Sequence, residues 1–140
     1  MPPEAVLFET NDWYKTTYLE KGTPLSIASF WGCTRIVEYL LQIGAKANNP
    51  NEVKALYNGV KTGKYKIIRL LLEAGIDIKS ENYKALKEAV ESDLMSFVQL
   101  MIKYIPEEDR PNILRKIAIN STNTLFKKRV SRYLNKIGSN

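Results

Sequence analysis

The stretch GTPLSIASFWGCTRIVEYLLQIGAKAN, residues 22–48, decides the fold because it predicts two short helices joined by a glycine turn. Thr23 is a good N-cap, and Pro24 fits the first helical position, where its missing N–H costs nothing. Gly32 can adopt the left-handed conformation of the turn, and Gly44 can end the second helix in the same way. Apolar residues recur at helical spacing in both segments. The stretch therefore predicts one helix–turn–helix unit.

The same unit recurs further along the chain. The segments TPLSIASFWGCTRIVEYLLQIGA, KALYNGVKTGKYKIIRLLLEAGI and KALKEAVESDLMSFVQLMIKYIP align with a leucine in one column, at Leu25, Leu56 and Leu86. Three further columns keep small or apolar residues: Ala28, Gly59 and Ala89; Val37, Ile68 and Val98; and Leu40, Leu71 and Met101. The leucine column repeats after 31 and then 30 residues, and a period of this size indicates stacked supersecondary units.

The later copies are weaker versions of the first. In the third copy Asp93 takes the place of the turn glycine, and Ile105 takes the place of the terminal glycine. A fourth copy is visible only in its second half, since RVSRYLNKIG, residues 129–138, echoes RIVEYLLQIG, residues 35–44. The stretch before it predicts a distorted first helix and a connection.

The first two copies resemble ankyrin repeats in the TPL opening, in the Ala and Gly that follow, and in IVEYLL and LLLEAG of the second helix. The resemblance implies an all-α ankyrin-repeat solenoid of stacked helix–turn–helix units with short finger loops. First helices would then line a concave face. Ser26 and Cys33 stand where the family usually has histidine, and we expect Ser26 to support the helix cap.

The repeat register predicts a single domain over residues 1–140. Its parts are an N-terminal cap segment, three repeats and a degenerate C-terminal cap, at residues 1–21, 22–50, 51–80, 81–106 and 107–140. The period is shorter than the typical ankyrin length of about 33 residues, so we expect blunt fingers.

The composition argues against catalysis, metals and cofactors. The chain has no histidine, and its single Cys33 allows neither an intrachain disulfide nor a cysteine cluster. GVKTGK, residues 59–64, departs from a phosphate-binding loop because three residues separate its glycines and Tyr65 follows its lysine. Glu88 and Glu91 share a helical face, which we interpret as solvated. We therefore predict that the protein is not an enzyme and has no cofactor.

The sequence also carries expectations about location. No apolar run approaches the roughly 18 residues that span a bilayer, so no membrane insertion is predicted. The first residues include Glu4, Glu9 and Asp12 without an early Lys or Arg, which does not suit a signal peptide. We expect a monomer in the cytoplasm, or in the cytoplasm of a host cell if the source is a pathogen or virus.

The resemblance further implies where a protein partner binds. In ankyrin proteins the contacts come from the fingers and from the two residues before each turn glycine. By register the turn residues are Phe30, Trp31, Lys61, Thr62, Glu91 and Ser92, and the finger residues are Pro50, Asn51, Ser80, Glu81, Asn82 and Tyr83. Phe30 and Trp31 are suited to anchor a partner in an adaptor, inhibitor or effector, because aromatic residues dominate binding hot spots. Cover by the N-terminal segment is an equal alternative.

The uneven charge gives a second functional hypothesis. The net charge is +6, and the eight basic and three acidic residues from Glu107 onward supply +5 of it. A basic patch for nucleic acid or another anionic surface would consist of Lys127, Lys128, Arg129 and Arg132. The alternative interpretation is the polar outer face of a last repeat, whose apolar stripe is Val130, Tyr133, Leu134 and Ile137.

Overall fold

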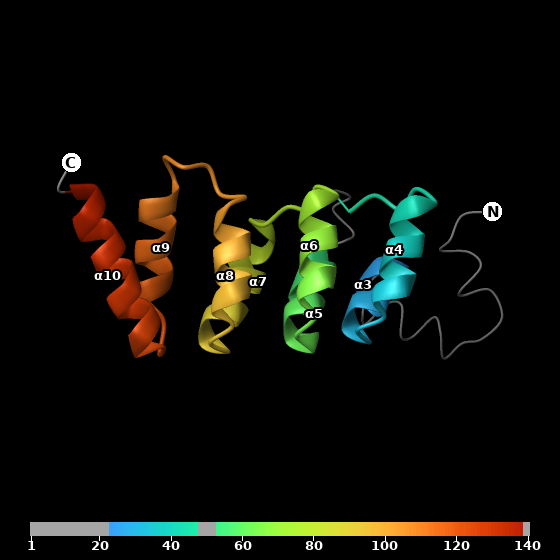
Figure 1. Cartoon of the computed structure of the whole chain (residues 1–140), viewed down its shortest axis with the longest axis horizontal. Helices are drawn as coiled ribbons and strands as arrows, with labels where there is room; N and C mark the ends of the chain where they lie inside the picture. The colour runs from blue at the N-terminus through green and yellow to red at the C-terminus, as the bar shows by residue number, and fades with distance from the viewer. Residues whose placement is uncertain (1–22, 48–52, 139–140) are drawn as a thin grey trace. The chain divides into compact units, whose positions relative to one another are not determined.

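The structure, a computed structural model, describes residues 23–47 and 53–138 (Figure 1). These ranges are helical and contain no strand, which confirms the predicted all-α fold. The helices are α3 (Pro24–Phe30), α4 (Thr34–Gln42), α5 (Val53–Thr62), α6 (Tyr65–Glu73), α7 (Ser80–Glu91), α8 (Met95–Ile102), α9 (Arg110–Ile119) and α10 (Thr124–Gly138). The chain divides into two compact units, residues 1–85 and 86–140, and each is considered by itself.

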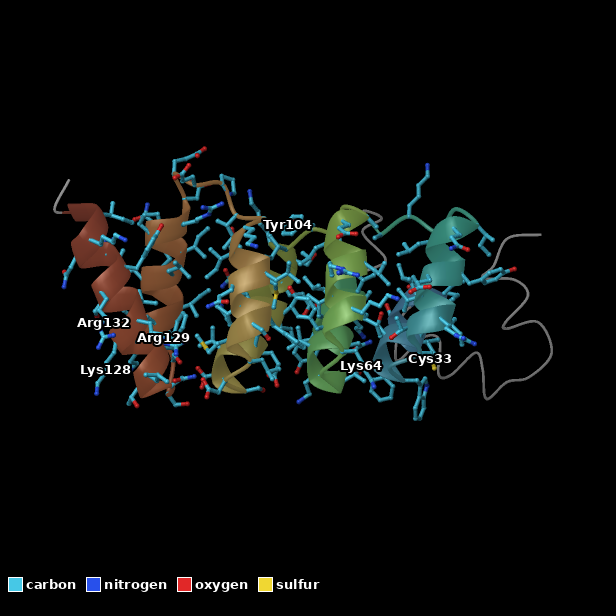
Figure 2. All side chains as sticks on the ribbon, viewed as in Figure 1. Cys33, Lys64, Tyr104, Lys128, Arg129 and Arg132 are labelled. Atoms are coloured by element: carbon cyan, nitrogen blue, oxygen red, sulfur yellow. The ribbon has the colours of Figure 1, made fainter. Side chains whose placement is uncertain are left out.

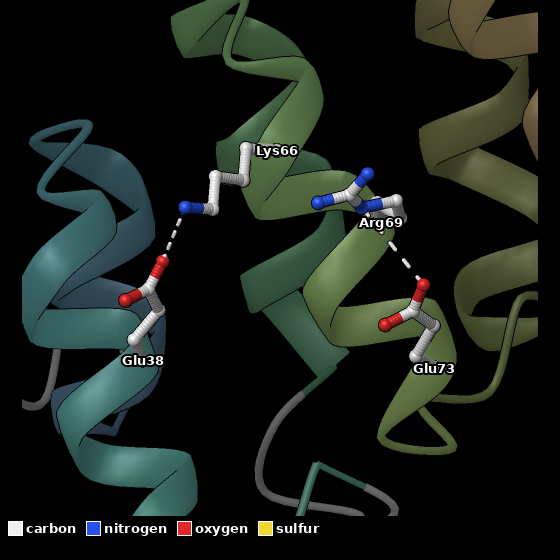
Figure 3. Close-up of polar contacts among 4 residues, drawn as sticks. All are labelled: Glu38, Lys66, Arg69 and Glu73. Carbon is white, nitrogen blue, oxygen red and sulfur yellow. Dashed lines mark ion pairs between the residues drawn. The ribbon is translucent and has the colours of Figure 1, made fainter.

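The first unit contains two helical hairpins, α3–α4 and α5–α6. The first helices of the hairpins, α3 and α5, pack against each other, and so do the second helices, α4 and α6 (Figure 1). An ion pair joins the second helices on the surface, where Lys66 Nζ lies 2.7 Å from Glu38 Oε1 (Figure 3). Consecutive copies of the sequence repeat are therefore stacked side by side in this unit.

The repeating columns of the sequence form the core. The leucine column is buried in all three copies, with exposed fractions of 1% at Leu25, 2% at Leu56 and 0% at Leu86. The column Val37, Ile68 and Val98 and the column Leu40, Leu71 and Met101 are also buried. The alignment of the three copies is thereby confirmed, because equivalent positions have equivalent burial.

Gly59 lies inside α5, where glycine weakens a helix, and its role is to let α6 approach. A Cβ atom at this position would lie 2.9 Å from Ile68 Cδ1 and 3.1 Å from Ile67 Cγ2. Contacts this short require a neighbour to move. The small residue in this column therefore lets the paired helices of this hairpin pack closely.

The predicted cap and turns are also present. The Thr23 side chain accepts a hydrogen bond from the Ser26 backbone N–H at 3.2 Å, and the Ser26 hydroxyl lies 3.2 Å from the Thr23 hydroxyl. Gly32 and Gly63 have φ values of +70° and +75° in the turns that join the paired helices. Asp93 adopts φ +56° at the equivalent turn of the third copy, so it replaces glycine without changing the backbone path.

The second unit holds the second half of α7 together with α8, α9 and α10. The fourth copy has both of its helices, and α9 packs against α10 through a buried face that includes Leu114, Ala118 and Val130. Glu81, Asn82 and Tyr83, at the start of α7, have left-handed φ values of 54°, 59° and 62°. This turn belongs to the first unit and precedes the regular part of the helix. The N-terminal cap segment predicted over residues 1–21 lies outside the described residues.

Candidate functional site

The two turns of the first unit lie beside each other because side chains of α5 reach back to α3. Thr62 Oγ1 lies 2.9 Å from the Ser29 carbonyl oxygen and 3.0 Å from that of Phe30. The Asn58 side-chain N–H donates to the Ser26 carbonyl oxygen at 3.0 Å. The bonds from Thr62 reach the last two residues of α3, where few helical N–H groups remain, and add to the Gly32 N–H that bonds the Ser29 carbonyl at 3.1 Å. They fix the end of α3 relative to α5.

Phe30 and Trp31 occupy this fixed end. Their rings make an edge-to-face contact, with centroids 5.1 Å apart and an interplanar angle of 88°. Phe30 is half-buried, whereas Trp31 is 61% exposed. A large indole therefore stands in solvent while the neighbouring ring restricts its orientation. The alternative that the N-terminal segment covers the pair concerns residues outside the described ranges.

Lys64 belongs to the same surface and was missed by the repeat register. A Cβ atom on Gly32 would lie 3.3 Å from Lys64 Cε and 2.6 Å from Thr62 Cγ2. The Lys64 side chain thus crosses the turn at Gly32, the residue that follows Trp31 in sequence. Figure 2 labels Lys64 near Cys33. Its place directly after the turn glycine Gly63 is the sequence signal that could have identified it. We call Phe30, Trp31, Lys61, Thr62 and Lys64 the turn edge.

The turn edge is positively charged, and none of its residues is adjacent in sequence to an acidic residue. Lys61 and Lys64 are both exposed, and Lys61 Nζ lies 6.0 Å from the centroid of the Tyr57 ring. The acidic residues of the described first unit are engaged elsewhere: Glu38 with Lys66, Glu73 with Arg69, Glu81 with Lys84, and Asp77 with the Lys79 backbone N–H. An aromatic side chain flanked by lysines is therefore presented to solvent.

Glu91, a predicted turn residue of the third copy, forms hydrogen bonds within the second unit. The carboxylate of Glu91 accepts hydrogen bonds from the hydroxyls of Ser121 and Thr122 and from the Thr122 backbone N–H at 3.3 Å. The Asn123 side-chain N–H donates to the Val90 carbonyl oxygen at 2.7 Å. Glu91 thereby anchors the α9–α10 turn to the end of α7.

These bonds lower the pKa of the Glu91 carboxyl below its usual value. The Ser121 hydroxyl has the largest effect, followed by the Thr122 hydroxyl, while partial desolvation opposes both. The negative form accepts these bonds and is therefore favoured. Ser92, the other predicted turn residue here, is exposed, and its hydroxyl donates to Glu88 Oε1 at 3.1 Å.

The predicted finger residues are only partly described. Ser80, Glu81, Asn82 and Tyr83 form the left-handed start of α7, with Glu81 and Asn82 exposed. The other two, Pro50 and Asn51, lie outside the described residues.

The basic run on α10 does not gather on one side of the helix. Successive residues of an α-helix are rotated by about 100°, so Lys127 and Arg129 flank the apolar face from opposite borders. Lys127 lines a hollow with Arg115 between α9 and α10, whereas Arg129 lines a cavity shared with α8. Lys128 and Arg132 are exposed on the remaining side, and Figure 2 labels all three α10 residues Lys128, Arg129 and Arg132.

Other candidate chemistry finds no support among the described residues. Residues 23–47 and 53–138 hold no group of three His, Cys, Asp or Glu side chains that could bind a metal. None of the helices in these ranges is long and apolar enough to cross a membrane. The glycines of the phosphate-loop-like stretch lie inside α5 and in the following turn, so that helix α5 rather than a strand leads into them. Cys33 is half-buried, and its thiol lies 3.9 Å from the Trp31 carbonyl oxygen.

Helix–turn–helix units repeating every 30–31 residues define a helical-repeat protein. The family model for ankyrin repeats in three copies matches residues 5–82 and again residues 25–113. The chain therefore belongs to the ankyrin-repeat family, whose repeats are generally modules for protein–protein interaction and typically not enzymes.

A curated relative is alpha-latroinsectotoxin-Lt1a of Latrodectus tredecimguttatus, which is 30% identical over 90 residues. The match covers 61% of this chain but only 6% of the relative, so the likeness is confined to a small part of a much longer protein. No solved structure matches the chain.

Proposed function

We propose that this chain is a non-catalytic protein-interaction module that binds a partner protein through its turn edge, with Trp31 as the anchor. The observation that carries the proposal is the 61% exposure of Trp31 at the fixed end of α3. Tryptophan is enriched at binding hot spots because it buries a large area with few rotatable bonds. The module then acts as an adaptor, inhibitor or effector.

The surroundings of Trp31 favour a partner surface that combines an apolar pocket with acidic residues. The contact with Phe30 already limits the motion of the Trp31 ring in the free protein. Less conformational entropy is therefore lost on binding, which leaves a more favourable binding free energy. Lys61 and Lys64 beside Trp31 would attract carboxylates and speed association. The finger residues Glu81 and Asn82, which belong to the same unit and are exposed, extend the proposed surface.

The proposed setting is a reducing compartment such as the cytoplasm, which suits the free thiol of Cys33. We propose a monomer that binds its partner as a single copy.

The experiment is a co-purification from the native host that compares three baits: wild type, Trp31→Ala and Tyr39→Ala. Tyr39 is the matched control because it is also an exposed aromatic residue of the first unit, 58% exposed, but lies on α4 away from the turn edge. We expect one specific prey to be lost with Trp31→Ala and kept with Tyr39→Ala. With purified prey, Trp31→Ala should weaken binding by about 30-fold or more, the size of a hot spot.

The proposal fails if the Trp31→Ala bait, with an unchanged circular dichroism spectrum, recovers the same prey as wild type at the same affinity. A loss of prey with both variants would mean that the contact is not confined to the turn edge but extends to α4, which also contradicts the proposal.

The second hypothesis, binding of nucleic acid or an anionic surface through α10, has weaker support. A phosphate backbone is contacted by several cations at once, whereas Lys127 and Arg129 border opposite sides of the apolar face. If it is correct, substitution of Lys127, Lys128, Arg129 and Arg132 by glutamate abolishes binding to a DNA duplex, and the wild-type affinity falls steeply with salt.

A further inference from the structure

A cavity of about 350 Å³ opens between α8 and α10 in the second unit. This volume lies within the range of about 300–1,000 Å³ that is typical of small-molecule sites. In the first unit the second helices α4 and α6 are joined by the ion pair of Glu38 and Lys66, but α8 and α10 are separated by this hollow.

The walls of the cavity are two facing helical stripes. On α8 the apolar side chains are Met95, Val98 and Ile102, and on α10 they are Phe126, Val130 and Tyr133. Both stripes follow the spacing i, i+3 or i+4, and i+7, which keeps their members on one side of each helix. Leu114 of α9 adds a further apolar surface. The interior can therefore accept an apolar body.

The charged side chains at the cavity are positive, and Gln99 adds a neutral polar group. Arg110 and Arg129 line it, and no acidic side chain does. Arg110 is held in place, since its Nε–H donates to the Ile105 carbonyl oxygen at 2.9 Å and its Nη2 to that of Lys103 at 3.4 Å. Arg129 forms no ion pair with any residue of the described ranges. A guanidinium with no ion-pair partner among the described residues thus borders a largely apolar cavity.

We propose that this cavity binds a small amphiphilic monocarboxylate, with its apolar body between α8 and α10 and its carboxylate on Arg129. A planar guanidinium forms two parallel hydrogen bonds to a carboxylate, so an acid fits this position better than a neutral head group. A cationic head group would be repelled by both arginines. The site lies in the second unit and is independent of the turn edge.

The occupant is a small molecule rather than a nucleic acid because only two cations, Arg110 and Arg129, line the cavity among mostly apolar side chains, and Arg110 already donates to backbone carbonyls. Lys128 and Arg132, which a phosphate backbone would need as further contacts, do not line the cavity, and Figure 2 labels them apart from Arg129 on α10.

The test titrates the full chain with decanoate, below its micelle concentration, and follows binding by calorimetry and by backbone amide shifts. Decyltrimethylammonium, with the same chain and the opposite charge, is the ligand control. We expect saturable one-to-one binding of decanoate, with the largest amide shifts at Val98, Val130 and Tyr133. Decyltrimethylammonium should not saturate.

Two neighbouring substitutions separate a site from general charge attraction. Arg129→Gln removes the cation at the cavity and should weaken decanoate binding about tenfold or more, since charged hydrogen bonds are worth more than neutral ones. Lys128→Gln removes the same charge one residue away and should change the affinity less than about twofold, because Lys128 does not line the cavity and interacts with the ligand only through solvent. The proposal is overturned if decanoate does not saturate, if both variants weaken binding equally, or if the cationic amphiphile binds as well.

Discussion

The hydroxyl oxygen of Thr62 lies 2.9 Å from the carbonyl oxygen of Ser29, although the two residues are 33 positions apart. It also lies 3.0 Å from the Phe30 carbonyl oxygen and 2.8 Å from that of Asn58 in its own helix. One hydroxyl proton serves one of these carbonyls at a time, so the group bridges α3 and α5 by alternation. This bridge holds the turn edge together.

Thr62→Val removes the hydroxyl and keeps the shape of the side chain. We expect the free energy of unfolding to fall by about 1–2 kcal/mol, because carbonyls at the end of α3 lose a hydrogen-bond donor. Urea denaturation measures the loss. The matched control is Thr34→Val, since Thr34 is a half-buried threonine at the start of α4, and its effect should stay within about 0.5 kcal/mol. Equal losses in the two variants would contradict the bridging role.

A pair of glycine substitutions separates backbone strain from side-chain contact. Gly32 and Gly63 have nearly the same φ, +70° and +75°, but only Gly32 has a neighbour that an added Cβ would strike. Gly63→Ala should therefore cost about 1 kcal/mol of stability, the cost of a left-handed alanine. Gly32→Ala should cost about 1–3 kcal/mol more, since Thr62 Cγ2 would lie 2.6 Å from the new atom.

Thermal or urea denaturation of both variants measures this difference. If Gly63→Ala costs as much as Gly32→Ala, the approach of Thr62 and Lys64 to the first turn is not tight, and the geometry of the turn edge is wrong.

The sequence predicted the core and the turns because both repeat. Burial at Leu25, Leu56 and Leu86 follows from one pattern present three times, and a pattern that recurs is hard to misalign. Even the exception at Asp93 was visible as a substitution in a glycine column, and its φ of +56° shows that the turn is the same. The fold could therefore be predicted from the repeat pattern.

Features that occur once were not predictable from the repeat. The bridge from Thr62 to α3 depends on how closely two turns approach, and Lys64 becomes part of the turn edge for the same reason. The basic run of α10 looked like one patch because its residues are adjacent in sequence, yet helical rotation divides Lys127 from Arg129. The sequence predicts the apolar stripe of α10. It does not predict the cavity, because the cavity depends on the distance between α10 and α8.

The Glu91 network predicts a pH dependence of stability in the second unit. The folded-state pKa of Glu91 is lowered below 4.5 by its hydrogen bonds to Ser121 and Thr122, whereas the unfolded chain keeps the ordinary value. The charged carboxylate therefore stabilises the fold above the unfolded pKa. This contribution is lost as the pH falls through the folded pKa.

Glu91→Gln should accordingly unfold at a lower urea concentration than wild type at pH 7, and the gap should narrow steadily on acidification below pH 4.5. Hydrogen exchange of the Thr122 amide, which donates to Glu91, should be faster in the variant at neutral pH. Glu107→Gln, an exposed glutamate outside the network, serves as the control. A gap between wild type and Glu91→Gln that does not change with pH would contradict the assignment.

The ion pair of Glu38 and Lys66 is short, 2.7 Å, but its side chains are 34% and 55% exposed. Exposed pairs gain little because water screens the charges and two flexible side chains must be ordered. A double-mutant cycle with Glu38→Gln and Lys66→Met should therefore give a coupling free energy of about 0.2–1 kcal/mol, reduced further in 1 M salt, where the screening length is about 3 Å. Urea denaturation of the four proteins measures the coupling. A coupling well above that range that resists salt would mean that this pair, rather than the apolar columns, holds α4 against α6.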